Sequence, residues 1–215
     1  VTTGILLLVG MLGFLVLEWN NPQTLEGKGL FDRIMAAVFQ SATVRTAGFD
    51  QMGQAALTSA SQALTVVLMF IGGSPGSTAG GIKTTTLAVL VLTAFAPYRG
   101  RNRASAFGRT ITQKSVTDAL SILVSGIFIV IIGSFMVSMA DGIAFDVALF
   151  ECVSGFATVG LTLGVTPDLT AFSQLVLVLL MFTGRVGVMT IGVAALFRNG
   201  GESKIKMPDG KVMIG

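Results

Sequence analysis

Apolar stretches of two lengths alternate along the chain, with short polar segments between them. The long stretches approach the roughly 20 residues that a helix needs to cross a bilayer core. They cover residues 1–19, 55–71, 82–98, 116–140 and 169–197. Two shorter stretches, 30–42 and 143–156, are too brief to span. We therefore predict an all-α membrane protein in which a re-entrant pore helix lies between successive spanning helices.

An offset of 112 residues aligns the second half of the chain with the first. In this register Leu-Thr-x-x-Ser-Gln occurs at 57–62 and 169–174, and Leu-Met-Phe-x-Gly at 68–72 and 180–184. Two shared patterns in one register indicate a duplicated helix–pore-helix–helix unit, with both copies parallel across the membrane. The chain then divides into a first pore repeat, a basic linker, a second pore repeat and a tail, at 1–98, 99–115, 116–197 and 198–215.

Composition excludes several classes of protein. Of the 215 residues, 52% are hydrophobic and only 12% are charged, whereas soluble domains carry about 25% charged residues. The single cysteine excludes a disulfide scaffold, and the absence of histidine removes histidine-based catalysis and metal sites. The basic residues lie between apolar stretches rather than on one polar face, so we predict a lipid bilayer and no nucleic acid as partner. We also predict that the chain is not an enzyme.

The charges predict an orientation in the membrane. Six basic and no acidic residues lie in 83–114, and the tail carries four basic residues against two acidic ones. By the positive-inside rule, 99–115 and 198–215 are expected to be cytoplasmic segments of a multi-pass plasma-membrane protein. Asp32 and Asp146 are interpreted as caps of the pore helices. The other outer carboxylates would form an acidic mouth that concentrates cations, but most of them are interpreted as residues that solubilise loops: Glu18, Glu26, Asp50, Asp141, Glu151 and Asp168. Glu151 in the second pore helix and Arg45 before the first turn are candidates for pairing with a neighbour near the mouth.

Each short stretch ends in a Thr-x-Gly turn, at 46–48 and 158–160. A half-helix that enters a membrane returns as extended chain, whose unpaired carbonyls are tolerated only beside protein or a water-filled cavity. Such carbonyls can replace the hydration shell of K⁺, and the negative end of the half-helix favours a cation. Glycine permits the positive φ that this backbone needs. The predicted filter residues are Thr46, Ala47, Gly48, Thr158, Val159 and Gly160. The alternative is a pair of helix-connecting turns with C-cap glycines.

A glycine-rich segment, 72–81, interrupts the second long helix of the first repeat. Its five glycines and Pro75 exclude a continuous helix. A phosphate-binding loop is rejected, because Ile82 separates the last glycine from Lys83 and no strand–helix–strand pattern surrounds it. Arg185 lies within the most apolar stretch, and the 112-residue offset aligns it with Gly73, so it is expected to face this segment. The alternatives are a passive kink and an arginine that caps helix carbonyls. Lys83 is interpreted as a lysine that reaches the membrane interface.

At these motifs the sequence resembles the superfamily of K⁺ transporters that includes KtrB, TrkH and the plant HKT proteins. The resemblance covers nearly the whole chain, and the sequence Arg-Thr-Ala-Gly-Phe at 45–49 is closest to that of KtrB. It rests on residues 41–49, 72–86, 155–161 and 181–187. It implies passive K⁺ uptake through a carbonyl filter, with K⁺ as the bound ion and no organic cofactor. It also implies a gate below the filter, formed by Gly72, Gly73, Ser74, Gly76, Ser77, Thr78, Gly80, Gly81 and Arg185.

The resemblance implies partners as well. Proteins of this family have four such units around one pore, and this chain resembles the third and fourth. Because it begins at Val1 with an apolar stretch that lacks the pattern of a signal peptide, we expect a longer protein that supplies the first two units. The family further implies a homodimer and a cytosolic ring of nucleotide-binding regulatory subunits, like KtrA or TrkA. The alternative function is a secondary transporter with broken helices, although its repeats would often be inverted.

Overall fold

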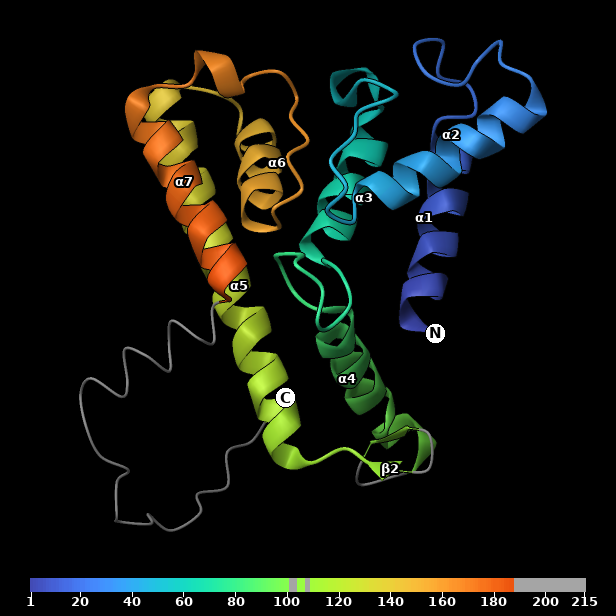
Figure 1. Cartoon of the computed structure of the whole chain (residues 1–215), viewed down its shortest axis with the longest axis vertical. Coiled ribbons are helices and arrows are strands. Elements are labelled where there is room, and N and C mark those ends of the chain that lie inside the picture. The colour runs from blue at the N-terminus through green and yellow to red at the C-terminus, as the bar shows by residue number, and fades with distance from the viewer. Residues whose placement is uncertain (101–103, 107–108, 188–215) are drawn as a thin grey trace.

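Helices make up most of the computed structural model, which describes residues 1–100, 104–106 and 109–187 (Figure 1). The prediction of a helical class is confirmed, and the second half of the last long stretch and the predicted tail lie outside the described residues. The α-helices are α1 Thr2–Leu17, α2 Leu30–Thr43, α3 Ser59–Phe70, α4 Thr84–Phe95, α5 Gln113–Asp141, α6 Phe145–Phe156 and α7 Ala171–Val186.

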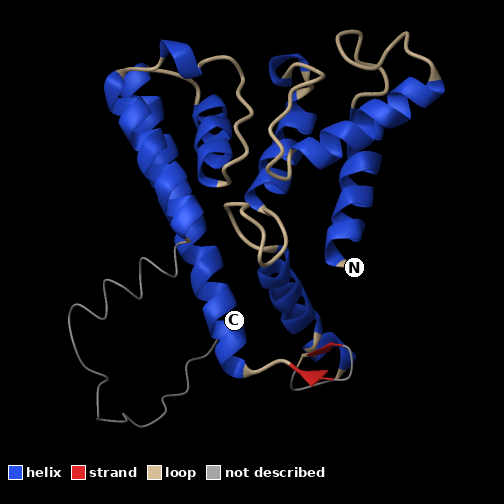
Figure 2. Cartoon of the chain, viewed as in Figure 1, coloured by secondary structure: helices blue, strands red, loops and turns tan. Residues whose placement is uncertain are grey.

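Short elements join these helices (Figure 2). Three 3₁₀ turns, η1 Gln54–Ala56, η2 Pro97–Arg99 and η3 Thr166–Asp168, lie in the connections. Strands β1 Ser105–Ala106 and β2 Arg109–Thr110 pair antiparallel between α4 and α5. This small hairpin lies at one end of the molecule, and the connection between α5 and α6 lies at the other (Figure 1).

Apolar side chains cover the outside of the helices. Within the described residues, α5 alone is long and apolar enough to cross a membrane, while α1, α3, α4 and α7 are apolar but shorter. Leu8 on α1, Phe128 on α5 and Phe182 on α7 are each about 60% exposed, at 58%, 64% and 63%. A water-soluble monomer rarely exposes such a continuous apolar surface. The exposed faces therefore require apolar surroundings.

The short helix α6 lies at the centre of the packing. It contacts α5 and α7 of its own half and α3 of the other half, whereas α2 packs on α1. The main core joins the two halves, because Met69 and Phe14 belong to the same buried cluster as Phe150 and Phe156. The rings of Phe70 and Phe156 stack at 6.0 Å across this junction. The position of α6 is therefore fixed by both halves of the chain.

Aligned segments of the two halves form the same local structure. The 3₁₀ turn η1 begins at Gln54 and η3 at Thr166, and both pairs of boundaries differ by the same 112 residues. Thr58 is the N-cap of α3 and accepts a hydrogen bond from the Ser61 amide, as Thr170 does from Ser173 at the start of α7. The shared Leu-Thr-x-x-Ser-Gln pattern is therefore a helix-capping signal.

Asp32 and Asp146 do not cap the short helices, contrary to the sequence interpretation. The N-caps are Gly29 for α2 and Ala144 for α6, and neither forms a side-chain capping bond. Both aspartates lie in the first helical turn instead. A carboxylate there is still favourable, because it faces the positive end of the helix dipole.

Glu18 ties the end of α1 to the start of α3. Its carboxylate is fully buried and accepts hydrogen bonds from the Asn21 side chain at 2.6 Å, the Thr24 hydroxyl at 2.6 Å, and the Thr58 amide and hydroxyl at 2.9 and 2.8 Å. Asp141, at the end of α5, accepts from the Thr170 amide at 2.7 Å in the same way. For these two residues the interpretation as loop solubilisers is wrong.

Glu18→Ala is expected to destabilise the protein by roughly 2–4 kcal/mol, because it leaves the buried donors of Thr58 and Thr24 without an acceptor. Thermal unfolding of the complete protein in detergent measures this loss. Glu26→Ala is the matched control, since Glu26 is exposed and belongs to the same connection. Equal melting temperatures for the two variants would show that the hydrogen bonds of Glu18 do not stabilise the protein.

Candidate functional site

The two Thr-x-Gly turns meet in the structure. They follow the ends of α2 and α6, which lie near the middle of the molecule (Figure 1). A Cβ atom built on Gly48 would lie 2.1 Å from the carbonyl oxygen of Val159. The backbone of the first turn therefore touches a carbonyl of the second, although the two are more than 100 residues apart. Only a residue without a side chain permits this approach.

Both turns have the same unusual backbone. φ is positive at Thr46 (69°) and Gly48 (75°), and again at the aligned Thr158 (56°) and Gly160 (88°). Thr46 and Thr158 are the only non-glycine residues with positive φ in the part of the chain that the structure describes. A β-branched residue is strained in this region, by about 1–2 kcal/mol. Such strain persists where the surrounding structure holds it and is concentrated at functional sites.

Buried polar networks hold the chain that returns from each turn. In the first half, Gln40 on α2 and Gln54 are hydrogen-bonded side chain to side chain at 2.9 Å, and Gln54 also donates to Asp50 at 2.8 Å. In the second half, Glu151 on α6 accepts from the hydroxyls of Thr162 and Thr166, each at 2.7 Å. Positions 50 and 54 align with 162 and 166.

These networks were missed from the sequence. The available signal was polar side chains inside short apolar stretches, namely Gln40 and Glu151. Glu151, a candidate for pairing near the mouth, holds the return segment to α6 through Thr162 and Thr166. Asp50 is exposed and accepts hydrogen bonds from Gln54 within its own return segment.

The interruption between α3 and α4 forms a folded loop, residues 71–83. Its ends are tied together: the Ile82 amide donates to the Phe70 carbonyl at 3.1 Å, and the Thr84 amide donates to the Gly73 carbonyl at 3.2 Å. Within the loop the chain crosses itself closely, since a Cβ on Gly72 would lie 2.1 Å from the Gly80 carbonyl oxygen. The glycines therefore allow a compact fold in little space.

This loop lies against the second turn and the end of α6. The Gly80 amide donates a hydrogen bond to the Thr158 hydroxyl at 2.9 Å. A Cβ on Gly80 would lie 2.7 Å from the Thr158 methyl carbon and 2.9 Å from the Phe156 carbonyl oxygen. The loop and the turn are thus in direct contact, backbone to side chain.

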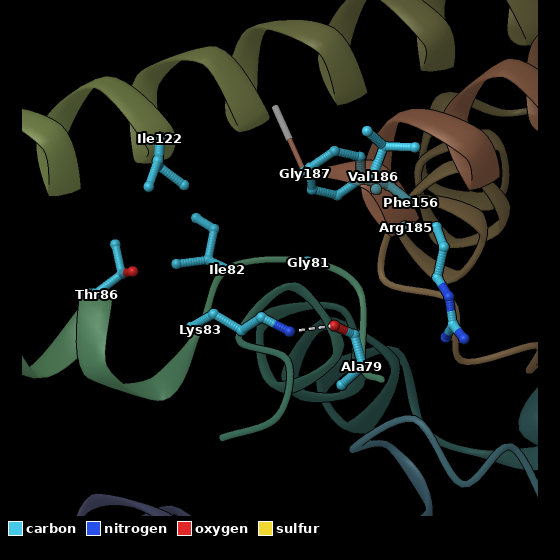
Figure 3. A pocket seen from close by; sticks show the side chains of 11 residues that line it. Ala79, Gly81, Ile82, Lys83, Thr86, Ile122, Phe156, Arg185, Val186 and Gly187 are labelled. Atoms are coloured by element: carbon cyan, nitrogen blue, oxygen red, sulfur yellow. Dashed lines mark hydrogen bonds between the residues drawn. The ribbon is translucent and has the colours of Figure 1, made fainter. Parts of the chain in front are cut away.

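Two positively charged side chains donate hydrogen bonds to loop carbonyls. The Arg185 guanidinium, on α7, donates to the Thr78 carbonyl, as its alignment with the loop led us to expect. The Lys83 ammonium donates to the Ala79 carbonyl (Figure 3) and to the Ser77 carbonyl. The interpretation of Lys83 as a lysine extended to the interface is therefore wrong. It folds back because its own loop offers acceptors within reach.

A cavity of about 140 Å³ is lined by residues of the loop, of α5 and of the end of α7. Ile82, Lys83, Ile122 and Val186 are among its lining residues. Among the described residues there is no group of three or more Asp, Glu, Cys or His side chains that could hold a metal ion. The acceptors that this region offers to a cation are therefore backbone carbonyls and hydroxyls.

Comparison with known proteins gives the family. Residues 4–203 match the family model TrkH, described as a cation transport protein. The chain belongs to this family of membrane cation transporters.

Three similar proteins illustrate the match. The potassium/sodium uptake protein NtpJ of Enterococcus hirae is 39% identical over 99% of this chain and 48% of its own length. The Ktr system potassium uptake protein B of Bacillus subtilis is 37% identical, with the same coverage of 99% and 48%. The crystal structure of the potassium transporter TrkH from Vibrio parahaemolyticus superposes with a TM-score of 0.75 at 20% identity, over 90% of this chain and 43% of that one. The chain spans about half the length of the curated relatives it matches.

Proposed function

We propose that this chain supplies two of the four units of a pore for K⁺ uptake, with 46–48 and 158–160 as filter segments. The observation that carries the proposal is the contact of the two turns, each with positive φ at the same two positions and each at the end of a short helix. The negative ends of α2 and α6 favour a cation at the turns. Carbonyls held by strained backbone cannot relax toward other partners, so they are available to replace the hydration of an ion.

We propose that the rest of the complete protein supplies the other two units. In this chain α6 packs against α3 of the preceding unit. The aligned helix α2 has no such neighbour among the described residues, and its outer face exposes Phe31, Met35 and Phe39 by 72%, 45% and 40%. The guanidinium nitrogens of Arg45, beside the first turn, are buried without a hydrogen-bond partner in the described part of the chain. A preceding unit would cover this helix and offer Arg45 an acceptor.

We propose that the loop 71–83 is a gate on the cytoplasmic side of the filter. It lies between the second turn and the end of the molecule that carries the α4–α5 hairpin (Figure 1). That end is basic, which favours the cytoplasm for residues 99–115. Arg185 stabilises the closed loop through Thr78, and its positive charge raises the barrier for a cation. The gate residues are Gly72, Gly73, Ser74, Gly76, Ser77, Thr78, Gly80, Gly81 and Arg185.

We propose that regulatory partners act at the same basic end. The complete protein would form a homodimer, and a cytosolic ring of nucleotide-binding subunits would dock on this surface and bias the loop. Charge complementarity supports docking there, since Arg109 and Lys114 belong to a connection without acidic residues.

Removing residues 74–79 is expected to raise K⁺ flux through the complete protein without its regulators, because the obstruction below the filter is shortened. Arg185→Gln is expected to raise it by roughly tenfold, the change for a barrier lowered by about 1.4 kcal/mol. Flux of ⁸⁶Rb⁺ into proteoliposomes measures both. Lys28→Gln, which removes an exposed cation far from the loop, is the control. Unchanged or reduced flux in well-folded deletion protein would contradict the gate.

A further inference from the structure

We propose that the Thr158 hydroxyl is shared between the gate and the filter: it holds the closed loop through Gly80, and it does so in competition with a cation at the inner end of the filter. This inference rests on the proposed filter and gate. It makes Thr158 a positioning residue for the loop, in addition to its place in the second turn.

The contact is specific in its geometry. The Gly80 amide and the Thr158 hydroxyl are 2.9 Å apart, between residues 78 positions apart in the sequence. Gly80 is buried, and its missing side chain is what allows the loop backbone to reach the hydroxyl, because any Cβ there would collide with Thr158. While the loop is closed the Gly80 amide is buried, so the Thr158 hydroxyl is what satisfies this donor.

The two aligned turns differ in this contact. Thr46 and Thr158 have the same residue type and the same positive φ. In the residues that the structure describes, however, the Thr46 hydroxyl makes no hydrogen bond, whereas the Thr158 hydroxyl accepts one from the loop. The contact is therefore not a general property of this backbone. It arises because the loop from the first half docks on the turn of the second.

The chemistry of a hydroxyl connects loop position to ion binding. The oxygen offers two lone pairs, and a hydrogen bond accepted from the loop removes electron density that a cation would use. A cation bound at this oxygen weakens the hydrogen bond from Gly80 in return. Such coupling is reciprocal: the factor by which the closed loop lowers K⁺ affinity at this position is the factor by which K⁺ opposes closure. Rising K⁺ at the inner end is thus expected to release the loop.

Few hydrogen bonds hold the loop to the second half of the chain within the described residues. Besides the Thr158 contact, the described residues provide the bond from Arg185 to the Thr78 carbonyl. Lys83 and Ser77 bond to carbonyls of the loop itself, at Ala79 and Ser74. Loss of the Thr158 hydroxyl therefore removes a large part of what fixes the loop below the filter.

The first experiment measures resting ⁸⁶Rb⁺ flux of the complete protein in liposomes without regulators. Thr158→Val is expected to raise this flux about fivefold to tenfold, the effect of leaving one donor unsatisfied. Thr158→Ser keeps the hydroxyl and is expected to stay well below the valine variant. Thr117→Val is the matched control, because the exposed Thr117 hydroxyl bonds to the Gln113 carbonyl within α5, outside the filter and the loop. When residues 74–79 are deleted, Thr158→Val is expected to add no further flux.

The second experiment uses the native threonine. Cys152, the single cysteine of this chain, is buried, and Ala79→Cys places a second thiol on the loop at a position that is buried while the loop is closed. Labelling of this thiol is expected to accelerate as K⁺ rises, relative to N-methylglucamine at equal ionic strength. The acceleration is expected to disappear in Thr158→Val.

The outcomes separate the inference from the proposed function. If the loop deletion leaves flux unchanged, the gate itself is wrong. If the deletion raises flux but Thr158→Val matches Thr117→Val, or Thr158→Ser raises flux as much as valine, the shared hydroxyl is wrong and the gate stands. A labelling rate that does not change with K⁺ concentration in protein with Thr158 intact would also overturn the inference. This result does not depend on the valine variant.

Discussion

Replacing Gly48 with alanine is expected to reduce the preference for K⁺ over Na⁺ by about tenfold or more, equivalent to at least about 1.4 kcal/mol. Two effects add at this position. The φ of 75° strains any side chain, by about 1–2 kcal/mol. The new Cβ would also lie 2.1 Å from the Val159 carbonyl oxygen, so one of the two turns must move. Because both turns are filter segments in our proposal, a shift of either changes the carbonyl positions offered to the ion.

Gly160→Ala and Gly27→Ala separate these effects. Gly160 has a φ of 88° and no atom within 4 Å of a new Cβ, so alanine there adds strain without a collision and is expected to reduce selectivity less. Gly27 has a φ of 79° and equally open surroundings, but it lies between α1 and α2 outside the site. Its alanine variant is expected to lose stability and keep selectivity. Relative uptake of K⁺ and Na⁺ in proteoliposomes measures the series, and equal selectivity in all three variants would contradict the filter.

Gly184→Ala is expected to destabilise the complete protein by roughly 3 kcal/mol or more. A Cβ on Gly184 of α7 would lie 1.7 Å from the Phe156 carbonyl oxygen and 2.7 Å from its carbonyl carbon. The obstacle is backbone at the end of α6, which cannot rotate away as a side chain would. Separation of α7 from α6 would also displace the turn that follows Phe156, so ion selectivity is expected to fall with stability.

Gly155→Ala is the control for this prediction. Gly155 lies in α6, one residue before Phe156, and its new Cβ would meet Met181 at an ordinary 3.7 Å. Its effect is expected to stay within about 1 kcal/mol, since alanine also favours the helix. Thermal unfolding in detergent compares the two variants. If Gly184→Ala unfolds at the temperature of Gly155→Ala, the close approach of α7 to α6 is wrong.

The sequence alone gave a good account of the local features. The lengths of the apolar stretches predicted the helical class, because the apolar character and the length of a segment can be read directly from its residues. The glycines and proline at 72–81 predicted the interruption, since they disfavour helix wherever they occur. The offset between the halves led to the expectation that Arg185 faces the loop, and the structure places its guanidinium on the Thr78 carbonyl.

Misinterpretation from the sequence concerned the hydrogen-bond partners of polar and charged side chains. Glu18 has the same residue type as exposed Glu26, and nothing in its neighbours along the chain distinguishes a buried acceptor from a solvated one. Lys83 was expected at the interface because long cationic side chains often extend there. In the folded chain it binds carbonyls only a few residues away.

The sequence by itself therefore determined which segments are helical, where the backbone must leave the helix, and which positions in the two halves are equivalent. These properties depend on short-range sterics and on the apolar character of neighbouring residues. Only the tertiary structure decided which equivalent positions differ in use. Thr46 and Thr158 are indistinguishable by residue type and alignment, but the loop reaches only the second, because α3 packs beside α6 and brings Gly80 to that turn. A hydrogen bond depends on where two segments meet in space, and alignment establishes equivalence without establishing contact.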